Sequence, residues 1–230
     1  MQTTITVDAI LFDMDGTLID STPGVLKAWA TFANDYGLDA DTVAHATHGR
    51  RLYDTLKEYC NIQDEDKLHE EIKRFEQEVL DGGPVPLAGA IPLLTTLNTL
   101  TEPAPSRWTI VTSASNFYAP QVLARASIPL PSSTGIITSN DVARGKPHPD
   151  PYLAGARACN VDPHACLVVE DAPSGVRSGH AAGSKVVAVC TSHSRQAMVD
   201  ASPDFVISDL TKMSVACIDG KFQVTLDTSE

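Results

Sequence analysis

Short apolar runs alternate with segments of helical periodicity along most of the chain. The apolar runs are too short for typical helices and predict buried strands over residues 9–12, 108–112, 135–138, 166–170, 185–190 and 204–207. Apolar residues at helical spacing predict helices over 90–100, 117–126, 149–159, 174–182 and 195–201. Strands that alternate with helices of this length are typical of βαβ units. The predicted fold class is therefore α/β, with a doubly wound parallel sheet.

The segment 23–81 departs from this alternation, because amphipathic helical patterns follow one another there without a strand pattern. Polar residues and Pro23 open it, and the Gly-Pro-rich run 82–86 closes it. We therefore predict a small α-helical cap domain over 19–85, inserted after the first strand of a core domain formed by 1–18 and 86–230. The charged residues of 64–81 are interpreted as a solvated helix face. Residues 212–230 lack a clear pattern and predict either an extra strand over 222–226 or a partly ordered tail.

The composition of the chain indicates which kinds of binding partner are disfavoured. The 230-residue chain has a formal net charge of −12, which disfavours nucleic acid and anionic membranes. No stretch approaches the ~20 apolar residues of a membrane span, and the first residues lack a signal-peptide pattern. Five cysteines without a CxxC pair favour free thiols in a reducing compartment. We expect a cytoplasmic monomer that acts on a small molecule.

Polar side chains follow the predicted strands. They are two acids after the first strand, a hydroxyl after the second, a lysine after the third and two acids after the fourth: Asp13, Asp15, Ser113, Lys146, Glu170 and Asp171. The carboxyl ends of parallel strands meet at one edge, where active sites of such sheets lie. Side chains alternate along a strand, so Asp13 and Asp15 are expected to point the same way and to need a cation between them. The pattern predicts an aspartate nucleophile, a second acid and Mg²⁺ at this edge.

This combination resembles the haloacid dehalogenase superfamily, in its phosphatase branch. The motif DMDGT at 13–17 matches the first signature, Ser113 the second, Lys146 the third and the pair Glu170-Asp171 the fourth. The resemblance implies that Asp13 is the nucleophile and Asp15 the general acid and base. It also implies that Ser113 and Lys146 bind the phosphoryl group.

The same resemblance implies a metal site. Asp13, the backbone carbonyl of Asp15 and Asp171 would hold Mg²⁺, with Glu170 as a direct or water-mediated ligand. The physical chemistry agrees, because a carboxylate that attacks a phosphate dianion needs its charge repulsion relieved. The reaction would then pass through an aspartyl-phosphate.

Three further blocks, at 48–51, 145–153 and 170–175, are similar to those of fungal glycerol-phosphate and 2-deoxyglucose-6-phosphate phosphatases. This similarity implies a small sugar or polyol phosphate as substrate. It also makes Arg51, rather than Arg50, the cap arginine that would reach the phosphate or the hydroxyl groups of the substrate.

The sequence is also compatible with two other functions. A phosphomutase of the β-phosphoglucomutase kind has the same core and cap, and a non-catalytic sugar-phosphate sensor could use the same fold. Five scattered histidines show no metal-ligand spacing and are predicted to be solvated or to cap helices: His45, His69, His164, His180 and His193.

Overall fold

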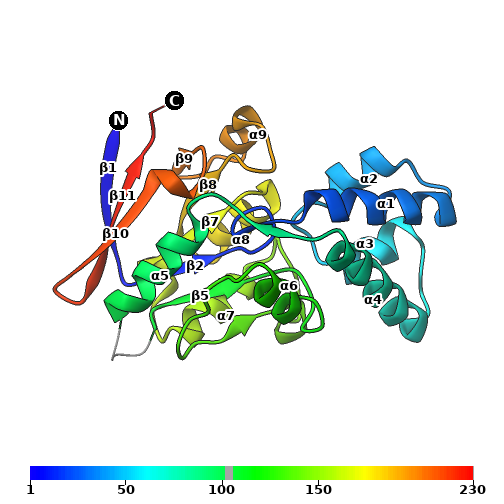
Figure 1. Ribbon diagram of the computed structural model, residues 1–230, viewed down its shortest axis with the longest axis horizontal. Helices are drawn as coiled ribbons and strands as arrows, with labels where there is room; N and C mark the ends of the chain where they lie inside the picture. The colour runs from blue at the N-terminus through cyan, green and yellow to red at the C-terminus, as the bar shows by residue number, and fades with distance from the viewer. Residues whose placement is uncertain (102–105, 230) are drawn as a thin grey trace.

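A computed structural model describes residues 1–101 and 106–229. Its centre is a sheet of parallel strands (Figure 1), and every pairing in this sheet is parallel. The order of the strands across the sheet is β6 (Ile136–Ile137), β5 (Trp108–Val111), β2 (Ala9–Phe12), β7 (Cys166–Glu170), β8 (Lys185–Val189) and β9 (Phe205–Ile207). The α/β class and the parallel sheet are thus confirmed. The strand β2, which ends directly before Asp13, lies inside the sheet between β5 and β7.

Helices cover both faces of this sheet, as the doubly wound prediction requires. Side chains of β2 alternate between two hydrophobic clusters, Ile10 and Phe12 in one and Ala9 and Leu11 in the other. The first cluster includes residues of α5 (Ala90–Thr101) and α6 (Ala119–Arg125). The second includes residues of α7 (Asp150–Ala158), α8 (Pro173–Ala181) and α9 (Arg195–Asp200). Among the described residues, three short 3-10 helices complete the connections: Ser139–Asp141, Pro163–Ala165 and Leu210–Lys212.

The helical insert consists of α1 (Thr22–Tyr36), α2 (Ala40–Thr47), α3 (Leu52–Tyr59) and α4 (Glu65–Asp81), and no strand interrupts it. Pro23 lies in the first turn of α1, and Gly37 ends that helix in the left-handed conformation. Trp29 and Phe32 of α1 pack edge-on against Phe75 of α4. Figure 1 shows the insert beside the strand ends of the sheet. The exact domain boundaries stay a prediction.

The chain enters and leaves the insert through one narrow connection. The strand β3 (Ile19–Asp20) precedes the insert and β4 (Val85–Pro86) follows it. These two strands pair antiparallel as a two-stranded ribbon. The insert is therefore attached to the rest of the molecule by two neighbouring segments.

A second sheet lies at the opposite end of the molecule from the insert (Figure 1). It joins β1 (Gln2–Val7), β11 (Lys221–Asp227) and β10 (Met213–Ile218) in antiparallel order. The extra strand predicted over 222–226 is confirmed, so the alternative of a partly ordered tail is wrong for residues 213–227. The strand β1 was not predicted. This sheet brings the chain ends together, since the backbone N–H of Thr228 donates to the carbonyl of Met1 at 2.9 Å.

Element boundaries differ from the sequence-based ones by a residue or two. Within the part of the chain that the structure describes, no helix has both the length and the apolar character needed to cross a bilayer.

Candidate active site

Asp13 lies at the end of β2, and the sheet fixes its position. Its backbone N–H donates to the carbonyl of Val169 at 2.9 Å, which extends the pairing of β2 with β7 by one residue. Its carboxylate forms a short ion pair with the ammonium of Lys146. Lys146 Nζ also donates to Glu170 Oε1 at 2.7 Å and to the carbonyl of Val111 at 3.2 Å. Asp13, Lys146 and Glu170, which come from three distant parts of the chain, therefore form one buried polar group.

Glu170 anchors this group, because protein donors occupy both of its oxygens. Oε1 accepts from Lys146 and from the hydroxyl of Tyr152 at 2.8 Å. Oε2 accepts from the backbone N–H groups of Asp171 and Ala172 at 2.9 and 3.0 Å. A Cβ at position 175 would lie 1.6 Å from Oε1, so Gly175 leaves the space that the carboxylate fills. These contacts make Glu170 a support for Lys146 and leave Asp13 and Asp171 better placed for an additional cation.

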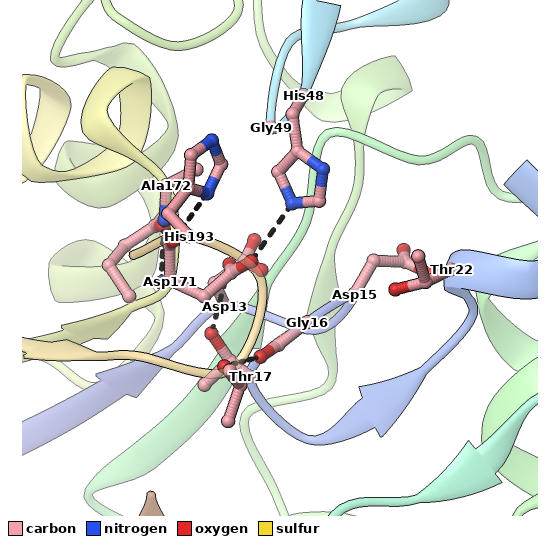
Figure 2. A network of polar contacts seen from close by, with 12 residues as sticks. Asp13, Asp15, Gly16, Thr17, Thr22, His48, Gly49, Asp171, Ala172 and His193 are labelled. Atoms are coloured by element: carbon pink, nitrogen blue, oxygen red, sulfur yellow. Dashed lines mark hydrogen bonds and ion pairs between the residues drawn. The ribbon is translucent and has the colours of Figure 1, made fainter. Parts of the chain in front are cut away.

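The loop after Asp13 turns sharply and packs closely on Asp171. Gly16 has a φ of +83°, and a Cβ there would lie 2.0 Å from Asp171 Oδ2. The hydroxyl of Thr17 donates to Asp171 Oδ1 at 3.3 Å (Figure 2). Asp171 Oδ2 lies 2.9 Å from His48 Nε2, which belongs to the segment between α2 and α3. Asp171 is therefore held between the first motif and the helical insert.

The site has an excess of negative charge. Oxygens of Asp13, Glu170 and Asp171 all lie within 4.8 Å of one another, and all three residues are buried. Burial raises the pKa of Asp13 well above its usual value; Lys146 opposes this rise, whereas Glu170 and Asp171 add to it. Burial alone would also raise the pKa of Asp171, but its contact with His48 holds that pKa below the ordinary range. Burial opposes protonation of His48, yet Asp171, Asp13 and Glu170 raise its pKa to about 9.

This donor set fits a hard divalent cation. Carboxylate oxygens are the ligands that Mg²⁺ prefers, and a cation next to Asp13 would offset the charges that raise its pKa. None of the buried ligand atoms of the Asp13, Glu170 and Asp171 group is sulfur or imidazole nitrogen, which zinc would favour. The acidic cluster can therefore hold a metal of the kind that the sequence predicts.

Asp15 occupies a different environment from Asp13. Its Oδ1 accepts from the hydroxyl of Ser21 at 2.6 Å and from that of Tyr118 at 3.0 Å. Burial raises the pKa of Asp15, and the two hydrogen bonds partly oppose the rise. The expectation that Asp13 and Asp15 point the same way around one cation is wrong for the Asp15 carboxylate. The strand ends at Phe12 and the chain turns at Met14, so the alternation of side chains does not continue to Asp15.

A cavity of about 350 Å³ opens at these residues, between the strand ends and the helical insert. Asp13, Asp15 and Ser113 line it from the core, and Trp29, Arg50 and Glu76 line it from the insert. The hydroxyl of Ser113 donates to the carbonyl of Gly49 at 2.9 Å, so core and insert touch at its rim. Asp13, Asp15 and Ser113 thus line one shared cavity.

The two cap arginines line different spaces. Arg51 Nε donates to Asp54 at 3.0 Å, and Arg51 lines a second cavity of about 300 Å³ together with Ser113. Arg50 lines the first cavity and pairs with Glu58 at 2.6 Å. The structure therefore brings Arg50, and not the predicted Arg51, to the cavity that contains Asp13.

Several residues of the site were not predicted from the sequence. His193 Nδ1 lies 3.0 Å from the carbonyl of Asp171, and its ring centroid is 4.8 Å from that of His48 (Figure 2). The prediction that His193 is solvated or caps a helix is therefore wrong. Glu76 is buried, which also corrects the interpretation of α4 as a solvated charged face at that position. His193 follows β8 as the motif residues follow their strands, and this placement could have identified it.

The carboxyl edge of the parallel sheet thus carries a buried aspartate paired with a lysine, a second aspartate two residues later and a cluster of three acids. Residues 7–183 match the family model of haloacid dehalogenase-like hydrolases. The chain belongs to this family.

Named relatives agree with this assignment. The chain is 42% identical over 182 residues to hexitol phosphatase A of Escherichia coli K12, covering 78% of this chain and 81% of the relative. It is 31% identical to glycerol-1-phosphate phosphohydrolase 1 of Saccharomyces cerevisiae, covering 97% and 89% of the two chains. A solved structure of a putative β-phosphoglucomutase from Bacteroides vulgatus superposes with a TM-score of 0.75 at 25% identity, over 90% of this chain and 85% of that one. The predicted resemblance and the assignment to the phosphatases of this family are confirmed.

Proposed function

We propose that the protein is a Mg²⁺-dependent phosphatase that hydrolyses a small sugar or polyol phosphate through an aspartyl-phosphate. The observation that carries this proposal is the separation of Asp13 from Asp15. Asp13 lies in an ion pair with Lys146, whereas Asp15 accepts hydrogen bonds from Ser21 and Tyr118 and has its pKa raised by burial. Two carboxyl groups in such different environments suit the roles of nucleophile and proton donor. The substrate class is supported by the names of the relatives.

The residues divide the reaction into two steps. A carboxylate oxygen of Asp13 attacks phosphorus, and the bond from phosphorus to the ester oxygen breaks. Asp15 donates its proton to that oxygen, so the sugar or polyol leaves as a neutral alcohol. Asp15, now ionised, then takes a proton from the water that attacks the aspartyl-phosphate. Inorganic phosphate leaves, and both carboxyl groups return to their first state.

Lys146 and Ser113 act on the transferred group. The ammonium of Lys146 is already at Asp13, where it can offset the charge of the phosphoryl oxygens. The hydroxyl of Ser113 faces the same cavity and can donate to one of those oxygens in place of the Gly49 carbonyl. Asp13, Asp171 and the backbone carbonyl of Asp15 would hold Mg²⁺, and Glu170 would orient Lys146 beside them. The bound metal would neutralise charge between the nucleophile and the phosphate.

Removal of divalent metal is expected to abolish phosphate release. The test is a screen of sugar and polyol phosphates in which released phosphate is measured with Mg²⁺ and with EDTA. We expect release with Mg²⁺, loss with EDTA and recovery when excess Mg²⁺ is returned, because the acidic cluster needs a cation to accept a phosphate dianion. Equal release with and without chelator would contradict the metal requirement. No release from any substrate would contradict the proposed function.

The phenol of Tyr118 is expected to set the alkaline limit of activity. Its hydrogen bond stabilises the ionised form of Asp15 and so lowers the pKa of that group. The first step needs Asp15 protonated, so kcat/KM falls as the pH rises through its pKa. In Tyr118→Phe this pKa rises further, and the alkaline limb should move up by about one pH unit. The measurement is the pH profile of kcat/KM; a limb that stays in place or moves down would contradict the role of Asp15.

A phosphomutase function has less support, because the relatives from Escherichia coli and Saccharomyces cerevisiae are named as a phosphatase and a phosphohydrolase. Incubation with a sugar phosphate distinguishes the two functions. A mutase gives an isomeric sugar phosphate, whereas the proposed enzyme gives free phosphate and the sugar.

A further inference from the structure

Glu76 is a buried acid that no step of the proposed reaction uses. It lies on α4 of the helical insert and is only 3% exposed. Its Oε1 accepts from the backbone N–H of Ser115 at 2.8 Å, and its Oε2 accepts from the hydroxyl of the same residue. Ser115 belongs to the core, two residues after Ser113. Glu76 therefore reaches from the insert to the core and is fixed there by two hydrogen bonds.

Glu76 lines the cavity above Asp13 and also the second cavity, to which Arg51 and Lys73 belong. An ionised carboxylate has about four acceptor positions, and Ser115 occupies one on each oxygen. No other hydrogen-bond donor among the described residues contacts this carboxylate. Phe75 and Val79, which flank Glu76 on α4, line the cavity with Trp29 and provide apolar contact for a carbon skeleton.

Glu76 lies on the side of the cavity where the leaving group departs. Asp15 and Glu76 line the same cavity. Burial raises the pKa of Glu76 to about 7, and the charge of Asp15 adds to this rise. Tyr118 donates a hydrogen bond to Asp15. Burial raises the pKa of Tyr118, and the charges of Asp15 and Glu76 add to this rise. Asp15 is the proposed donor of a proton to the leaving oxygen. The part of the substrate beyond that oxygen is therefore in the neighbourhood of Glu76.

This half of the cavity offers little positive charge. Among the described residues that line the cavity, Arg50 is the only arginine or lysine, and it already pairs with Glu58. His48, which also lines the cavity and has a raised pKa, is paired with Asp171 at 2.9 Å. Lys146 lies where the phosphoryl group is proposed to bind, and it pairs there with Asp13 and Glu170. Asp41 lines the cavity as a further acid. A second anionic group on the substrate would thus meet a buried carboxylate without a free cation to balance it.

We propose that Glu76 is a specificity-determining residue that selects an uncharged, hydroxyl-bearing leaving group and rejects one with a second phosphate or a carboxylate. This inference rests on the proposed function and narrows its substrate class. Hydroxyl groups of a sugar or polyol can donate to the free acceptor positions of Glu76. A carboxylate or a phosphate dianion cannot donate, and the buried carboxylate of Glu76 repels its charge.

Two pairs of substrates test this selection in the wild type. Glycerol phosphate is compared with phosphoglycerate, and sorbitol 6-phosphate with 6-phosphogluconate; in each pair a CH₂OH group is replaced by a carboxylate. Initial rates of phosphate release at pH 8 with saturating Mg²⁺ give kcat/KM for each compound. We expect the alcohol to be preferred roughly 10²-fold, because juxtaposed like charges discriminate strongly. Equal kcat/KM values within both pairs would overturn the inference while leaving the phosphatase function intact.

A matched set of variants assigns the selection to Glu76. Glu76→Gln keeps the shape but removes the charge, and should reduce the preference for the alcohol by roughly tenfold or more. Glu76→Asp keeps the charge and should retain most of the preference. Glu70→Gln changes an exposed acid of the same helix and should leave the preference unchanged.

The outcomes remain separable if the neutral variant is unstable. Thermal unfolding followed by circular dichroism shows whether Glu76→Gln is folded. A folded Glu76→Gln enzyme with wild-type preference would overturn the assignment. If Glu76→Gln does not fold, the assignment is judged from the ratio of kcat/KM for the alcohol to kcat/KM for the carboxylate. This ratio is compared between Glu76→Asp and the wild type. Release of no phosphate from any of the four compounds or from p-nitrophenyl phosphate would instead contradict the proposed function.

Discussion

Replacement of Asp13 by asparagine is expected to abolish turnover without unfolding the protein. The amide has nearly the shape of the carboxylate but is a far weaker nucleophile, so kcat should fall by roughly 10³-fold or more. The fold should persist, because the contacts of Asp13 with β7 are made by its backbone. The change also removes one of three buried acids, which offsets part of the loss of the Lys146 ion pair.

Phosphate release measures the first effect and far-ultraviolet circular dichroism with thermal unfolding measures the second. Asp66→Asn is the matched control, since Asp66 is an exposed acid in the first turn of α4. It should retain wild-type turnover. An Asp13→Asn enzyme that releases phosphate at the wild-type rate would rule out the covalent route through this residue.

Replacement of Lys146 by methionine should damage both stability and activity. Lys146 is 2% exposed and is paired with both Asp13 and Glu170. Without it two buried carboxylates lose their cation, and the free energy of unfolding should fall by about 3–5 kcal/mol. Turnover should fall roughly 10²–10³-fold, because the charge that stabilises the phosphoryl oxygens is lost.

Denaturant unfolding with and without Mg²⁺ tests the electrostatic origin of this loss. A divalent cation at Asp13 and Asp171 should recover part of the stability of Lys146→Met, because it binds the folded state. Lys27→Met, which removes an exposed lysine of α1, is the control and should change neither quantity appreciably. Wild-type stability and turnover in Lys146→Met would show that this lysine is not part of the site.

The parallel sheet was predictable because its signal is local. Each strand is a continuous apolar run, and β2, β5 and β7 are buried along their whole length. In the second sheet only β11 was anticipated, as the possible strand over 222–226. The strand β1 alternates exposed residues with partly buried or buried ones, half of its residues are threonine, and its partner β11 lies more than 200 residues away in the sequence. Pairing between the two ends of a chain has no pattern within a short window.

The site was predictable as far as the strand ends determine it. Asp13, Lys146, Glu170 and Asp171 follow or lie near ends of strands that the topology places side by side, and the structure brings them together. The contributions of the insert were not predictable, because they depend on how its helices face the sheet. Arg50 and Arg51 are neighbours in sequence but line different cavities.

The burial of Glu76 was likewise not predicted from the sequence. In the sequence it is one of many charges in α4, which together suggest a solvated face. Its position one residue after Phe75 and three before Val79 lies within the apolar stripe of the helix, and this spacing was the available signal. What the stripe could not reveal is that Ser115 of the core meets the carboxylate there.

The paired strands β3 and β4 are the place where the helical insert joins the core. Ile19 pairs with Pro86 and Asp20 with Val85, so the two ends of the insert lie one strand spacing apart. A short turn could close this ribbon, or a different set of helices could be grafted onto it, without a change in the order of the central strands. The recognition of the leaving group that we propose for the insert could therefore be changed by replacing this segment, while Asp13, Lys146 and Glu170, which the core holds, keep their positions.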